Sequence, residues 1–147
     1  MTKAKAKLIE LVYGSDLMAT RAILGFAELL WAITLLWPGD TFGRPTYSGM
    51  QLLASEEAWG FLFLASSFFQ FQILASHNMH NRWSVLFAGF NAFLWMLVVT
   101  SMYMSVYPPP AAISGELALA LGASWIFVRT GVPVLKSERR PDVRPIH

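Results

Sequence analysis

One acidic residue inside a long apolar segment is the feature of this sequence best suited to chemistry. Glu28 lies near the middle of residues 17–37, where the only other charged residue is Arg21. An ionised carboxylate is costly at the centre of a bilayer, so Glu28 is expected to face other protein segments. There it can act as a proton relay, an ion site or a contact for a polar ligand. It can also serve as a neutral acid that joins helices by hydrogen bonds, and this structural role is the one we favour.

Pairing with a base is a further option, and Arg21 is the nearest basic residue along the chain. Seven residues of helix rise ~10 Å at ~1.5 Å per residue. The two side chains would share a helix face but lie too far apart to pair directly. Arg21 is instead expected near the inner end of its helix, with Arg82 and Arg129 at the same interface. Long basic side chains in such positions can extend their heads to lipid phosphates.

Several other polar residues are expected at a depth similar to that of Glu28. Helix rise, counted from the inner ends, places two serines level with the acid and three further polar residues ~3–6 Å lower. Hydrogen bonds between membrane helices contribute ~1 kcal/mol or less each, which is enough to fix helix register. The alternative is an aqueous vestibule, but one acid and a few amides make a thin pathway. The expected cluster consists of Glu28, Ser66, Ser67, Gln70, Asn91 and Ser124.

Two histidines invite a metal or haem interpretation. His77 and His80, with Met79 between them, lie in the polar segment 76–82, which is expected to be a turn. Two ligands do not complete a zinc site. A haem held between helices needs histidines at depth on different helices, and no histidine lies at depth in the apolar segments. We therefore expect neither a metal nor another cofactor, and we interpret both histidines as solvated turn residues.

The sequence contains no recognisable catalytic motif. It has no cysteine, which excludes thiolate catalysis and disulfides. A nucleophile elbow, a phosphate-binding loop and a zinc-protease motif are also missing. Nucleic-acid binding has no support either, because the basic residues at the termini have a simpler topological role. The expected protein is therefore not an enzyme.

The elements that must position these residues are long apolar helices. Hydrophobic residues make up 55% of the chain and charged residues only 14%, about half the usual share for a soluble domain. A helix of 21 residues covers ~30 Å, the thickness of the hydrocarbon core. We predict an all-α integral membrane four-helix bundle in a single domain, 1–147. Its spans are expected at about 17–37, 57–77, 83–107 and 112–135.

The segments outside the spans have distinct compositions. Residues 2–13 mix lysines with apolar residues, which is typical of a short helix lying on the membrane surface. We expect Gly14 to end that helix. A further short helix is predicted to begin near Ser48, in the turn-rich connection that follows the first span. Residues 136–147 form a polar tail.

Lysine and arginine predict the orientation. With both termini inside, ten of the eleven basic residues lie at the inner side, and only Arg44 lies outside. Basic residues concentrate on the cytoplasmic side of membrane proteins. An even number of spans also requires both termini to lie on one side. The inner group comprises Lys3, Lys5, Lys7, Arg21, Arg82, Arg129, Lys136, Arg139, Arg140 and Arg144.

Residues 21–47, RAILGFAELLWAITLLWPGDTFGRPTY, resemble small uncharacterised multi-span membrane proteins encoded in tailed-phage and prophage genomes. The resemblance covers about a fifth of the chain and carries no catalytic motif. It implies a bacterial inner-membrane setting and a role in infection, lysis or exclusion of other phages.

Three functional hypotheses follow. The first is a non-enzymatic membrane protein that assembles with itself or with a membrane-protein partner. The second is a small proton or ion channel or transporter that uses Glu28. The third, a redox or lipid-modifying enzyme, has the least support, because buried histidines and a catalytic constellation are both missing. Small residues four apart, such as Ala118 and Gly122, indicate close helix contacts but do not separate internal contacts from oligomeric ones.

Overall fold

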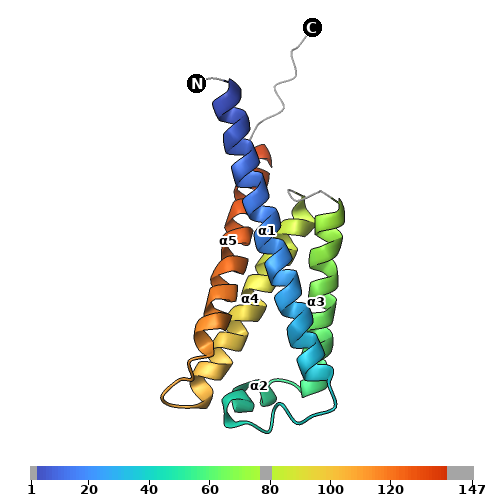
Figure 1. Cartoon of the computed structure of the whole chain (residues 1–147), viewed down its shortest axis with the longest axis vertical. Helices are drawn as coiled ribbons and strands as arrows, with labels where there is room; N and C mark the ends of the chain where they lie inside the picture. Colours follow the sequence, from blue (N-terminus) through green and yellow to red (C-terminus); the bar gives the residue numbers. More distant parts are fainter. Residues whose placement is uncertain (1–2, 77–80, 139–147) are drawn as a thin grey trace.

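The computed structural model describes residues 3–76 and 81–138, and its side chains over 16–76 and 81–132. Helices are the only regular elements in this part of the chain, which confirms the all-α prediction (Figure 1). The elements in chain order are α1 (Lys3–Leu36), η1 (Pro45–Tyr47), α2 (Ser48–Gln51), α3 (Glu56–Ser76), α4 (Arg82–Ser105) and α5 (Ile113–Glu138).

The helix ends follow local sequence signals. α1 ends at Leu36, one residue before the helix-breaking pair Pro38-Gly39. α3 begins with Glu56 and Glu57, whose negative charge suits the positive end of the helix dipole. At the start of α4, the Asn81 side chain caps the helix by accepting a hydrogen bond from the Ser84 backbone N–H at 2.6 Å. The long helices therefore lie close to the four predicted segments.

The prediction of a separate N-terminal helix that ends at Gly14 is wrong. α1 runs without interruption from Lys3 to Leu36, a length of 34 residues. A glycine inside a helix costs only about 1 kcal/mol relative to alanine, and residues 3–36 contain no proline to remove a backbone donor. Once the helix has formed, each further residue adds a backbone hydrogen bond, so the helix continues through Gly14.

Three helical segments are long and apolar enough to cross a membrane. They are Asp16–Leu36 of α1, Glu56–Ser76 of α3 and Arg82–Ser105 of α4. α5 occupies the fourth predicted segment but is not among these three. It contains four charged residues, Glu116, Arg129, Lys136 and Glu138. By length and composition, the described residues are those of a membrane protein.

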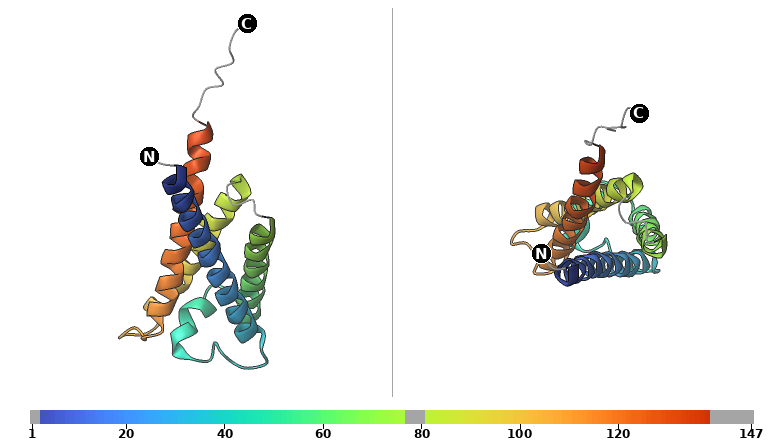
Figure 2. Two further views of the ribbon diagram at one scale, coloured as in Figure 1. Left: turned by 45° about the horizontal axis from the view of Figure 1, so that its top comes forward. Right: turned by 90° about the horizontal axis from the view of Figure 1, so that it is seen from above.

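The four long helices lie side by side around a common interior. α1 packs mainly on α3, α4 packs mainly on α5, and α1 also contacts α5 (Figures 1 and 2). Close approaches between α3 and α4 are few, so this corner of the assembly is the loosest. α2 and its flanking connections lie at the end opposite to the start of α1 and the end of α5 (Figure 1).

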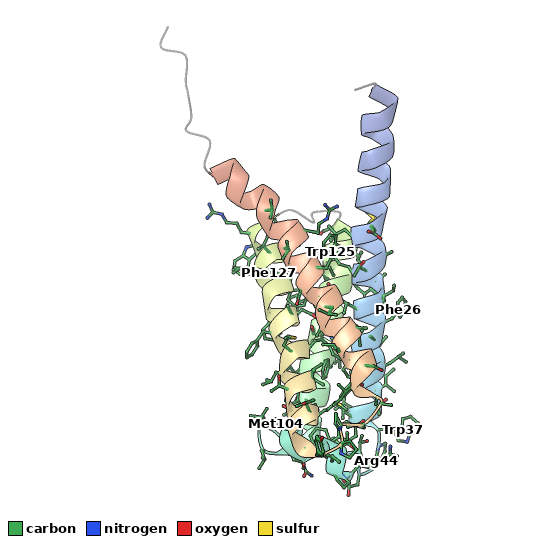
Figure 3. All side chains as sticks on the ribbon, turned by 90° about the vertical axis from the view of Figure 1, so that its left-hand side faces the viewer. Phe26, Trp37, Arg44, Met104, Trp125 and Phe127 are labelled. Atoms are coloured by element: carbon green, nitrogen blue, oxygen red, sulfur yellow. The ribbon has the colours of Figure 1, made fainter. Side chains whose placement is uncertain are left out.

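The side-chain distribution differs from that in a soluble protein. Large apolar side chains such as Phe26 and Trp37 point away from the helices (Figure 3) and are 58% and 70% exposed. Arg21 and Glu28, by contrast, are 0% exposed. A soluble protein rarely exposes broad apolar surface, whereas lipid-facing helices do so as a rule. The helices thus present an apolar exterior around a partly polar interior.

Candidate functional site

The buried Arg21 forms the first of two polar layers between the helices. Its Nη1 donates a hydrogen bond to Gln70 Oε1 at 3.1 Å, and its Nη2 donates to Ser84 Oγ at 2.7 Å. These contacts connect α1 to α3 and α4. We refer to Arg21, Gln70 and Ser84 as the arginine layer.

The arginine layer corrects one prediction. Arg21 was expected to extend its head to lipid phosphates, but its side chain is fully buried among the helices. The physical reason is that the interior supplies two oxygen acceptors from facing helices, so the guanidinium is satisfied without reaching the membrane surface. Hydrogen bonds to charged groups are stronger than those between neutral groups.

The second polar layer surrounds Glu28. Its Oε1 accepts hydrogen bonds from Asn91 Nδ2 and, at 3.4 Å, from Trp95 Nε1. Asn91 Nδ2 also donates to Ser66 Oγ at 3.0 Å. Asn91 of α4 therefore connects Glu28 of α1 to Ser66 of α3. We refer to Glu28, Ser66, Asn91 and Trp95 as the glutamate layer.

The two layers repeat because their residues lie seven positions apart. Arg21 and Glu28 have this spacing on α1, and Ser84 and Asn91 have it on α4. Seven residues are close to two helical turns, so both members of each pair face the interior, ~10 Å apart along the axis. Ser67 lies between the layers and donates to the backbone carbonyl of Gly25 at 2.8 Å.

Three buried polar atoms in these layers have no hydrogen-bond partner among the described residues. They are Arg21 Nε, Glu28 Oε2 and Asn91 Oδ1. Glu28 Oε1 accepts the hydrogen bonds from both Asn91 and Trp95, so the second carboxyl oxygen, Oε2, is buried without a partner. Such groups are uncommon in folded proteins and often mark a functional position. Chemically, the glutamate layer has room for one more polar interaction.

The interior beyond the glutamate layer, toward α2, is filled by aromatic rings. Trp31, Phe63 and Trp95 contact one another, with ring centroids 5.2–5.8 Å apart. Trp59 stacks on Phe63 and donates its indole N–H to the Met50 carbonyl of α2 at 3.1 Å. The arginine layer thus lies in the half of the interior nearer the chain termini, and the glutamate layer lies near the middle of the helices.

The remaining predicted site residues lie outside the two layers. Ser124 donates to the carbonyl of Ala120 in its own helix at 2.8 Å, as isolated helical serines commonly do. The side chain of Arg82 is exposed, and the guanidinium of Arg129 lies 5.4 Å from the Trp125 ring. His77 and His80 fall outside the described residues.

Sequence reasoning missed two members of the network, Ser84 and Trp95. Ser84 was overlooked because one serine near a helix end carries little information alone. The sequence does carry one indication of its role. Ser84 lies seven residues before Asn91, the same interval that separates Arg21 from Glu28. Trp95 was hidden among many aromatic residues, and its indole N–H becomes significant only once Asn91, one turn earlier, faces an acid.

A lateral groove of about 600 Å³ opens where α3 and α4 separate. Apolar side chains form most of its wall, and several of them are exposed, including Phe69 and Trp83. Two hydroxyl residues, Ser66 and Ser84, also line it, one from each polar layer. The apolar lining of the groove includes Leu62, Ala65, Phe69, Ile73, Trp83 and Phe90.

In comparisons with known proteins, no protein family, no curated protein and no solved structure matches this chain.

Proposed function

We propose that this chain is a non-enzymatic inner-membrane protein that acts by self-assembly or by binding a membrane-protein partner. Its four long helices would form a membrane bundle, with α5 as the fourth span and both termini in the cytoplasm. The observation that carries this proposal is the combination of a broadly apolar exterior with buried, hydrogen-bonded polar side chains. Arg21, Gln70 and Asn91 are buried and hydrogen-bonded between helices, while the exterior is broadly apolar.

The polar layers suit a structural role within such a protein. Each layer links three helices, and each hydrogen bond between membrane helices contributes about 1 kcal/mol. Their main effect is to fix which residues face one another, leaving the lipid-facing surface for assembly. Native mass spectrometry from mild detergent, with cross-linking in the native membrane, tests this proposal. A strictly monomeric protein without a cross-linked partner would overturn it.

The proposed orientation rests on the distribution of lysine and arginine, with ten on the cytoplasmic side and only Arg44 on the other. Arg44 lies at the opposite end of the molecule from the start of α1 (Figure 3). Because the chain has no cysteine, single cysteines can report on each side. A cysteine at Gly39 should react with an impermeant maleimide on intact cells. A cysteine at Lys136 should react only after lysis, and the reverse pattern would refute the orientation.

The resemblance of residues 21–47 to phage-encoded membrane proteins supports a role in lysis, infection or exclusion of phages. Expression of the chain alone in a bacterial host separates these roles. Loss of the membrane potential on induction supports lysis, and a reduced plating efficiency of challenging phages supports exclusion. If neither is seen and deletion from a phage leaves its growth unchanged, the phage role is refuted.

A second candidate function, proton or ion transfer, is favoured by one specific observation. Glu28 Oε2 and Asn91 Oδ1 are buried acceptors without partners, a setting in which a proton donor or a cation would be bound. This candidate predicts flux across liposomes that contain the purified protein, and loss of that flux in Glu28→Gln. Unchanged flux in Glu28→Gln would exclude it.

A further inference from the structure

The groove between α3 and α4 has a length along the helices similar to the thickness of one membrane leaflet. On α3 its lining runs from Leu62 to Ile73, which is eleven residues or ~16 Å of rise. On α4 it runs from Trp83 to Phe90, about 10 Å. The hydrocarbon core is ~30 Å thick, so one leaflet provides ~15 Å. The groove is therefore about as long as a single leaflet, and most of it lies on the side of the bundle where the termini lie.

The wall of the groove suits a hydrocarbon chain. The rings of Phe69 and Phe87 approach within 5.6 Å across the two helices, and Phe69 and Phe90 are exposed to the surroundings. The oxygens of Ser66 and Ser84 already accept hydrogen bonds from Asn91 and Arg21. An apolar occupant of the groove consequently leaves those hydrogen bonds intact. A polar occupant would find few groove atoms still available for hydrogen bonding.

The mouth of the groove is suited to a phosphate. Asn81 and Trp83 both line the groove, and the exposed Arg82 lies between them along the chain, at the start of the 24-residue α4. The start of a helix carries a partial positive charge, which favours anions. Trp83 is 78% exposed, and tryptophan prefers the level of lipid headgroups. The charge at the mouth and the apolar wall together match a molecule with an anionic head and a hydrocarbon tail.

We propose that the α3–α4 groove binds an anionic phospholipid of the cytoplasmic leaflet, with one acyl chain in the groove and its phosphate at Arg82 and the start of α4. A helix of a second copy or of a partner is less suitable, because it would cross both leaflets. Toward α2, the space beyond the groove is filled by Phe63, Trp95 and Trp59. The proposal depends on membrane insertion as proposed above, but not on any particular assembly.

Photo-cross-linking tests the site directly. Full-length protein is reconstituted in phosphatidylcholine vesicles that contain, as a minor component, phosphatidylglycerol with a diazirine on one acyl chain. Mass spectrometry should place the cross-links on α3 and α4 peptides that line the groove. Ala65→Trp adds bulk inside the groove and should reduce labelling about tenfold or more, the equivalent of at least ~1.4 kcal/mol. The matched control is Ala118→Trp, which adds the same bulk at an exposed position of α5 and should leave labelling unchanged.

The headgroup preference is tested by competition with unlabelled phosphatidylglycerol or phosphatidylcholine. Arg82→Gln should reduce the advantage of phosphatidylglycerol about fivefold, the effect of one basic residue near an anionic surface. Arg44→Gln, at the opposite end, should not change it. Both side chains are exposed, and the unfolding midpoint of each variant in mixed micelles verifies that it is folded, whatever the effect of Ala65→Trp.

Three results would overturn the lipid site. Uniform labelling of all lipid-facing helices would show ordinary bilayer contact. Equal competition by both unlabelled lipids would remove the anionic preference. Dimer cross-links that disappear in Ala65→Trp, without lipid labelling of the groove, would assign it to a second copy. Failure of membrane insertion itself is separate, since the protein would then not float with the vesicles.

Discussion

Replacing Glu28 tests whether the glutamate layer is structural. Glu28→Gln keeps an oxygen that can accept from Asn91 and Trp95, and it places an N–H₂ group where Oε2 has no partner. Glu28→Leu removes both hydrogen bonds. It leaves the Trp95 indole N–H unpaired and leaves one Asn91 N–H unpaired in the interior. A buried polar group without a partner costs about 1–3 kcal/mol.

The expected losses follow from these contacts. Glu28→Leu should lower the free energy of unfolding by about 2–4 kcal/mol. This value assumes two unpaired donors, each costing about 1–2 kcal/mol. Glu28→Gln should lie within about 1 kcal/mol of the unmodified protein, because a neutral acid and an amide then make the same contacts. Reversible unfolding in mixed micelles, with increasing mole fraction of a denaturing detergent, measures both values. Asp16→Asn, at an exposed acid, serves as the control and should change stability by less than about 0.5 kcal/mol.

Two results would refute this reasoning. If Glu28→Leu is as stable as the unmodified protein, the hydrogen bonds of the glutamate layer do not hold the helices together. If Glu28→Gln loses as much stability as Glu28→Leu, the negative charge itself is required, and the structural role is wrong. A double-mutant cycle with Asn91→Leu then isolates the pair, with an expected coupling of about 0.5–1.5 kcal/mol.

Three further substitutions should behave as the packing requires, each measured by the same unfolding assay. Arg21→Lys should cost about 1–2 kcal/mol, since an ammonium group cannot reproduce the planar fork that serves both partners; an unchanged stability would contradict the arginine layer. Gly49→Ala should cost about 1–3 kcal/mol, because the new Cβ would lie 2.4 Å from the Ser101 carbonyl oxygen, whereas Gly39→Ala, with no atom within 4 Å, should be near neutral. Ser124→Ala should change stability by less than about 0.5 kcal/mol, because its hydroxyl bonds only within its own helix, and a larger loss would place Ser124 in the network.

The long apolar segments are a property of the sequence itself. Segments of about 20 predominantly apolar residues without strand alternation are expected to be helices in lipid, so the helix class and approximate helix positions follow from composition and length. Glu28 was recognisable for the same reason, since a carboxylate in such a run must face protein. Depth counting also placed Ser66 and Asn91 near Glu28, because helix rise per residue is nearly constant.

Tertiary structure decided what sequence reasoning could not. Whether Arg21 points to lipid or inward depends on acceptors from Gln70 and Ser84, which lie 49 and 63 residues away along the chain. Ser124 has a suitable depth, yet its hydroxyl bonds to Ala120 of its own helix, and rotation about a helix axis is set by packing alone. The groove exists only because α3 and α4 separate while each packs on another helix. Depth along a helix is encoded locally, whereas the direction a side chain faces is settled by its neighbours.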